Sequence, residues 1–116
     1  METLKPSFCV RSKVWIEDGE GHVVFGLGRL KILKTIEQTG SIQAAAKELK
    51  MSYRGVWGKV RATEERLGQP LLIRNIGGSS GGGSQLTPFA RQLIERFYDL
   101  NREIAEYADE HFERLK

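Results

Sequence analysis

The pattern of apolar and polar positions near the N-terminus predicts a β-hairpin. Residues 8–16 are rich in β-branched and aromatic types, and residues 22–25 form a second apolar run. The turn cluster EDGEG at residues 17–21 separates the two runs, an arrangement typical of a hairpin. We therefore predict a hairpin over residues 8–25, which either lengthens the sheet of the wing predicted below or packs on the long C-terminal helix.

Apolar residues at helical spacing predict three short helices after the hairpin. Glycine or a turn residue follows each helix, and a serine stands as N-cap before the second and the third. The predicted helices cover residues 29–39, 42–50 and 53–67. We expect Leu27 to extend the apolar face of the first helix and Trp57 to pack in the core.

The rest of the chain predicts a two-stranded β-wing and a long helix. The low-complexity run GGSSGGGS at residues 77–84 resembles a flexible linker, but it lies between a predicted strand and a helix cap, where a wing tip belongs. Thr87 and Pro88 are typical of a helix start. We predict strands over residues 71–75 and 85–87, within a wing over 71–87, and a helix over 88–115.

Five apolar residues on this last helix recur at spacings of 4, 3, 4 and 3, which is a heptad pattern. They are Leu93, Phe97, Leu100, Ile104 and Tyr107. The predicted helix is longer than the small domain before it can cover by packing. This length favours a dimer interface with a second copy of the chain. The alternative is that the same residues form only intramolecular core.

The order of elements predicts a winged helix-turn-helix, a mainly α fold with small β elements, as a single domain over residues 1–116. In such a fold the third helix enters the major groove of DNA and its first side chains reach base edges. N–H groups at helix starts favour backbone phosphates. The candidate DNA-binding residues are Ser41, Gln43, Ser52, Tyr53, Arg54, Gly55, Gly58, Lys59, Arg61, Arg74 and Asn75.

Several of these candidates have distinct expected roles. Arg54 suits a forked contact with guanine, and Gly55 and Gly58 remove bulk where the backbone meets DNA. Arg74 and Asn75, with the glycine loop, suit a phosphate or the minor groove. The basic residues also fit an ordinary solvated helix face, and Tyr53 fits core packing as well as DNA contact.

Composition and charge narrow the class of protein. The 116 residues are 40% hydrophobic and 28% charged, which is ordinary globular composition. Residues 1–90 carry 13 Lys and Arg against 8 Asp and Glu, whereas residues 91–116 carry 5 against 7. A basic body suits a polyanionic partner, although an excess of this size is common.

Other features lead us to expect a cytoplasmic binding protein without a cofactor. The start of the chain does not read as a signal peptide, and no apolar run is long enough to cross a membrane. Cys9 is the single cysteine, which excludes an internal disulfide. Cys9, His22 and His111 lack the spacing of metal ligands, and no nucleophile–base set is present, so we predict neither a metal site nor an enzyme.

Three segments carry a family resemblance. TGSIQAAAKELKMSYRGVW (39–57) and GGSSGGGSQLTPFARQLI (77–94) resemble the N-terminal DNA-binding domain of ModE-type, molybdate-responsive regulators, while EERLGQPLLIR (64–74) resembles the LysR-type helix-turn-helix. The resemblance spans residues 29–92 and, with the hairpin, most of the chain. It implies a winged-helix transcription factor that dimerises through helices including the C-terminal one.

The same resemblance raises a question about the ligand. ModE-type regulators carry molybdate-binding domains after this point, whereas this sequence ends at Lys116. We therefore expect no molybdate-binding domain and identify no small-molecule effector. The predicted function is a sequence-specific, homodimeric, DNA-binding transcriptional regulator with double-stranded DNA as partner. The alternatives are a winged-helix protein-interaction module and a non-specific DNA-binding protein.

Overall fold

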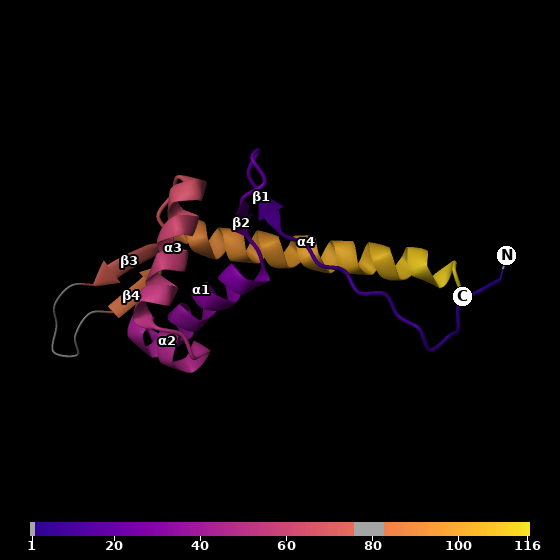
Figure 1. The fold of residues 1–116 in the computed structure, drawn as a ribbon, viewed down its shortest axis with the longest axis horizontal. Helices are drawn as coiled ribbons and strands as arrows, with labels where there is room; N and C mark the ends of the chain where they lie inside the picture. The colour runs from indigo at the N-terminus through magenta and orange to yellow at the C-terminus, as the bar shows by residue number, and fades with distance from the viewer. Residues whose placement is uncertain (1, 76–82) are drawn as a thin grey trace.

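The computed structural model describes residues 2–75 and 83–116, so residues 77–82 of the predicted wing tip (77–84) lie outside the described residues. Its last two residues, Gly83 and Ser84, belong to the returning strand, which therefore starts two residues earlier than predicted. The chain contains a small hairpin, three helices, a two-stranded wing and a long last helix (Figure 1). The elements are β1 (Ile16–Glu17), β2 (Val23–Phe25), α1 (Leu27–Thr39), α2 (Ile42–Leu49), α3 (Tyr53–Leu67), β3 (Leu72–Asn75), β4 (Gly83–Leu86) and α4 (Pro88–Glu113).

Local signals at the helix ends account for the helix-turn-helix. The Ser41 and Ser52 hydroxyls accept hydrogen bonds from the backbone N–H groups of Ala44 and Gly55, at 3.0 and 2.9 Å. Gly40 ends α1 with φ at +86°, a conformation that glycine adopts without steric cost. Lys50 ends α2 in the same left-handed region with φ at +58°. The four predicted helices are therefore observed, within two residues at each end.

A single core joins α1, α2, α3, the wing and the first half of α4. Buried apolar residues from each of these elements and from β2 form one cluster, with partly buried residues, including Trp57, packed against it. The largest fully buried side chains are Phe25, Phe97, Leu33, Ile36, Leu71, Val56 and Val60. Burying each such side chain stabilises the fold by about 1.5–3 kcal/mol.

The predicted apolar face of α1 is wrong at one position. Leu27 is 48% exposed, whereas Ile32, which the sequence pattern left off the face, is 5% exposed. Leu27 is the first residue of α1 and lies beside the exposed residue Val23 and the side chain of Trp15. The start of α1 therefore projects beyond the core, while Ile32 in its middle turn is enclosed.

The N-terminal hairpin is shorter than predicted. β1 and β2 pair antiparallel only through Ile16 with Phe25 and Glu17 with Val23. Residues 8–15 form no strand because α1 begins at Leu27 and leaves no backbone after β2 for them to pair with. They form an extended segment instead, and nearer the start of the chain the Leu4 N–H donates to the Leu115 carbonyl at 2.7 Å, so the two ends of the chain lie close together (Figure 1).

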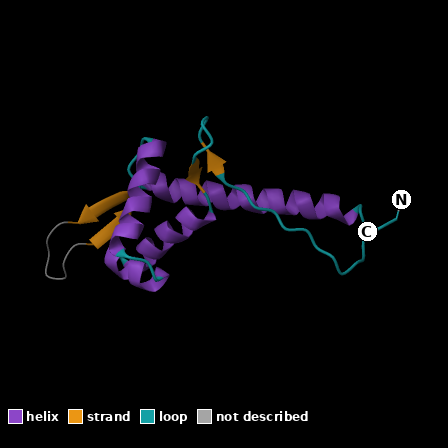
Figure 2. Cartoon of the chain, in the orientation of Figure 1, coloured by secondary structure: helices purple, strands orange, loops and turns teal. Residues whose placement is uncertain are grey.

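The hairpin packs on the long helix rather than extending the wing. β1–β2 and β3–β4 form two separate sheets, coloured orange in Figure 2. The Phe25 ring meets the Phe97 ring of α4 edge to face, with centroids 5.1 Å apart and an interplanar angle of 88°. Such aromatic pairs add about 0.5–1.5 kcal/mol to the burial of their surface.

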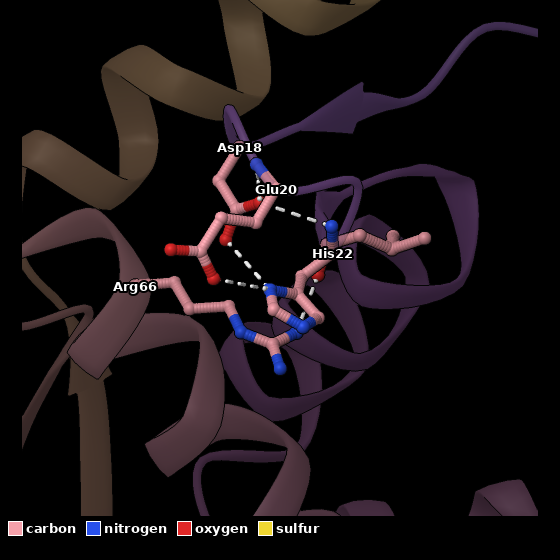
Figure 3. A network of polar contacts seen from close by, with 5 residues as sticks. Asp18, Glu20, His22 and Arg66 are labelled. Atoms are coloured by element: carbon pink, nitrogen blue, oxygen red, sulfur yellow. Dashed lines mark hydrogen bonds and ion pairs between the residues drawn. The ribbon is translucent and has the colours of Figure 1, made fainter.

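A polar network closes the hairpin turn and ties it to α3 (Figure 3). Asp18 accepts hydrogen bonds from the backbone N–H groups of Glu20 and His22, and the His22 bond is the main reason that the pKa of Asp18 lies below its usual value. Arg66 of α3 donates to the Val23 carbonyl at 2.8 Å. The hairpin is thus held to the body from both α3 and α4.

Candidate nucleic-acid interface

The first turns of α3 present an exposed basic surface. Arg54, Gly58 and Arg61 lie one above another on one face because their spacing is 4 and 3, and all three are exposed. Lys59 is exposed beside them. Arg54 and Lys59 make no hydrogen bond or ion pair through their side chains with any residue of 2–75 or 83–116. Their charges are therefore available to an external anion.

Arg61 differs from these two residues. Its Nε lies 3.9 Å from the Glu65 carboxylate, and both side chains are more than half exposed. An exposed pair at this distance contributes little to stability and is easily exchanged for another partner. Arg61 is therefore accessible to a phosphate at small cost.

The two glycines of α3 have different reasons to be glycine. A Cβ on Gly55 would lie 3.0 Å from the capping hydroxyl of Ser52, so Gly55 serves the helix start itself. A Cβ on Gly58 would meet nothing within 4 Å. The described fold does not need a glycine at position 58, although glycine weakens a helix by about 1 kcal/mol relative to alanine.

The base of the wing contacts the start of α3 through three side chains. Arg74 of β3 donates from Nη2 to the Tyr53 hydroxyl at 2.5 Å. The same guanidinium lies over the Trp57 ring, 4.8 Å from its centroid. Tyr53 is 41% exposed, so it lies at the surface rather than in the core. We call these residues the Tyr53–Arg74–Trp57 cluster.

The other predicted residues surround this surface. Ser41 and Gln43 lie at the start of α2, where Ser41 is the N-cap and Gln43 is exposed. The backbone of Asn75 pairs with Gly83 at the described end of the wing, and its side chain lies outside the described residues. The structure thus brings the helix starts and the wing base to one end of the molecule (Figure 1).

The sequence did not predict two sets of hydrogen bonds that hold the wing against the helices. The Glu64 carboxylate accepts hydrogen bonds from the backbone N–H groups of Leu71 and Leu72, at 2.7 and 3.4 Å, which fixes the entry into β3. The Ser84 N–H donates to the Gly40 carbonyl at 2.8 Å, which ties β4 to the α1–α2 turn. Neither contact lies within one helix or strand, so no local pattern indicates them.

The predicted seam on α4 divides into two parts. Phe97 is 2% exposed and Leu93 is half-buried against the core of the same chain. Farther along α4, Leu100 is 39% and Tyr107 is 64% exposed, with Ile104 half-buried between them. Figure 1 shows this distal half of α4 projecting away from the body. Of the five predicted seam residues, the distal three are therefore the ones that the core of their own chain leaves uncovered.

The described residues also bear on a metal site and on membrane insertion. Within residues 2–75 and 83–116, no three His, Cys, Asp or Glu side chains are grouped to hold a metal ion. None of the helices described there is both long and apolar enough to cross a membrane.

Two helices joined by a tight turn, packed on a third helix and followed by a two-stranded wing, define a winged helix-turn-helix. Residues 27–91 match the model of the bacterial regulatory helix-turn-helix proteins, lysR family, and the chain belongs to this family. The match begins after the hairpin and ends in the first turn of α4.

The predicted resemblance to ModE-type regulators is confirmed. The chain is 44% identical over 80 residues to the transcriptional regulator ModE of Haemophilus influenzae, covering 69% of this chain and 31% of the relative. It is 35% identical over 80 residues to the DNA-binding transcriptional dual regulator ModE of Escherichia coli K12, covering 69% and 30%. The chain thus spans about a third of the length of these relatives.

The structural comparison agrees on the fold. The CbnR DBD–DNA complex contains a chain that superposes with a TM-score of 0.58 at 23% identity, covering 79% of this chain and all of that one. At this level of identity the likeness shows the winged-helix fold alone.

Proposed function

We propose that this chain is the sequence-specific DNA-binding unit of a dimeric transcriptional regulator. The observation that carries the proposal is the exposed first half of α3, where Arg54 and Lys59 have no partner among the described residues. α3 would lie in the major groove, with Arg54 against a guanine edge and Lys59 and Arg61 near phosphates. A relative described as a DNA-binding transcriptional regulator supports this assignment.

The remaining site residues would position the protein on the DNA backbone. Ser41, Gln43 and Ser52 lie at the starts of α2 and α3, where N–H groups and the helix dipoles favour phosphates. The strand that carries Arg74 and Asn75 would bring the wing to the adjacent phosphate or minor groove. Because the target is chromosomal DNA, the proposed location is the cytoplasm.

The proposal is tested by selecting bound duplexes from a random DNA pool at about 150 mM salt, where non-specific phosphate contacts are weakened. We expect a palindromic motif whose half-sites are about 34–36 Å, or a multiple of this distance, apart. Salt-dependent binding without a preferred sequence would overturn sequence specificity and favour a non-specific DNA-binding protein. No binding to any duplex would overturn the proposal and favour a protein-interaction module.

A further inference from the structure

We propose that Arg74 is a positioning residue, which sets the distance and angle between the wing and α3 through Tyr53 and Trp57. This inference rests on the proposed DNA-binding function and deepens it. The obvious role for an exposed arginine on a wing is a direct phosphate contact. The geometry assigns Arg74 a different primary role, because two groups of α3 already hold its guanidinium.

The contacts of the guanidinium fix it in position and in plane. The Tyr53 hydroxyl accepts a hydrogen bond from the Arg74 Nη2 group at 2.5 Å. The centroid of the Trp57 ring lies 4.8 Å from the guanidinium carbon Cζ. Tyr53 and Trp57 are one turn apart on α3, so a single planar group contacts both. A lysine cannot do this, because an ammonium group lacks the flat face and the fork of donors.

The position of Arg74 in the wing gives these contacts their effect. Arg74 pairs with Ser84 across the β3–β4 ladder, and the Ser84 N–H donates to the carbonyl of Gly40, which precedes the N-cap of α2. One pair of wing residues is therefore tied on one strand to the start of α3 and on the other to the start of α2. The wing is therefore fixed to both helices of the helix-turn-helix through one pair of facing residues.

The hydrogen bond also prepares Tyr53 for DNA. Because the hydroxyl oxygen accepts from a charged guanidinium, its own proton is free to donate and is more polarised. Tyr53 lies immediately after the α3 N-cap, where a phosphate is expected. Arg74 thus orients a neutral donor as well as the wing.

The test is a double-mutant cycle with Arg74→Lys and Tyr53→Phe, measured against the selected operator and a random duplex. We expect each single variant to weaken operator binding by about tenfold, and the double variant to be no weaker than the worse single variant. The loss should be larger for operator than for random DNA, because only specific binding needs wing and α3 together. Arg102→Lys on distal α4 is the matched control and should leave both affinities unchanged.

Two results would overturn the assignment. If the losses of the single variants multiply in the double variant, Arg74 and Tyr53 make independent contacts with DNA. If Arg74→Lys binds operator as tightly as the unaltered protein does, a positive charge at position 74 is sufficient for binding and the guanidinium contacts are not needed.

A measurement without DNA separates this inference from the proposed function. In a Trp15→Phe background Trp57 is the only tryptophan, and acrylamide quenching of its fluorescence reports how well the guanidinium covers the ring. We expect Arg74→Lys and Tyr53→Phe to increase quenching, while circular dichroism stays unchanged. Unchanged quenching would overturn the cluster even if DNA binding is established. Increased quenching in a protein that binds no DNA would refute the proposed function alone.

Discussion

Arg54 is the residue on which base recognition is expected to depend. It lies in the first turn of α3, fully outside the core and unpaired among the described residues. Arginine at this place in a recognition helix suits the two acceptors that guanine presents in the major groove.

Arg54→Ala should therefore weaken operator binding by about 1–3 kcal/mol and relax the preference at one base position. The measurement is a titration of the operator and its single-base variants by fluorescence anisotropy. Lys59→Ala is a useful comparison, because loss of a phosphate contact should weaken binding to all sequences alike. If the Arg54→Ala protein keeps its affinity and its base preference, Arg54 does not recognise a base.

Gly58 allows a second prediction, in which stability and binding change in opposite directions. Gly58→Ala should stabilise the fold by about 0.5–1 kcal/mol, because alanine favours the helix and its Cβ meets nothing within 4 Å. The same Cβ should weaken operator binding if this face approaches DNA closely. Urea unfolding and operator titration measure the two effects.

The matched control for this prediction is Gly28→Ala in the first turn of α1. A Cβ there also meets nothing within 4 Å, but Gly28 lies beside the hairpin rather than on the exposed face of α3. It should leave operator affinity unaltered. If Gly58→Ala binds operator as tightly as Gly28→Ala, Gly58 does not lie against DNA.

At the scale of elements, the junction between α3 and the wing depends on Glu64. Its carboxylate accepts from the backbone N–H groups of Leu71 and Leu72, which precede and begin β3. Buried or half-buried N–H groups that lose an acceptor cost free energy, because water no longer satisfies them fully.

Glu64→Ala should lower the free energy of unfolding by about 1–3 kcal/mol. Glu65→Ala removes the neighbouring carboxylate, whose contact with Arg61 is exposed and 3.9 Å long, and should change stability by less than about 0.5 kcal/mol. Urea unfolding of both variants checks the difference. Equal effects would show that the Glu64 contacts do not support the wing.

At the scale of the whole molecule, the projecting half of α4 is the proposed dimer surface. Leu100 and Tyr107 are large side chains that remain exposed on a helix extending away from the body. The first two predicted seam residues, Leu93 and Phe97, already pack on the core of their own chain. A substitution at Phe97 would therefore disturb folding and association together.

Leu100→Glu should shift the protein from dimer to monomer, because a charge would be buried between two copies. Sedimentation velocity measures the change, and Ile104→Glu should act in the same way. Gln92→Glu adds the same charge to α4 at an exposed position outside the seam and should leave the dimer intact. A Leu100→Glu protein that sediments as a dimer would place the interface elsewhere.

The sequence by itself determined the elements and their order. Caps such as Ser41, Ser52 and Thr87 act within a few residues, and apolar spacing fixes which face of a helix is buried, so both can be read locally. These signals were sufficient for four helices and a wing. They failed at residues 8–15 because a strand needs a partner, and strand propensity alone does not reveal that α1 begins directly after β2.

Only the tertiary structure decided which residues meet. Phe97 and Tyr107 belong to the same heptad seam, yet Phe97 packs on Phe25 and Tyr107 is exposed, because the helices and strands before α4 cover only its first half. Arg74 reads as one more basic residue until folding brings it to Tyr53, 21 positions away. Such contacts depend on how separate elements pack against one another, which no local spacing along the chain encodes.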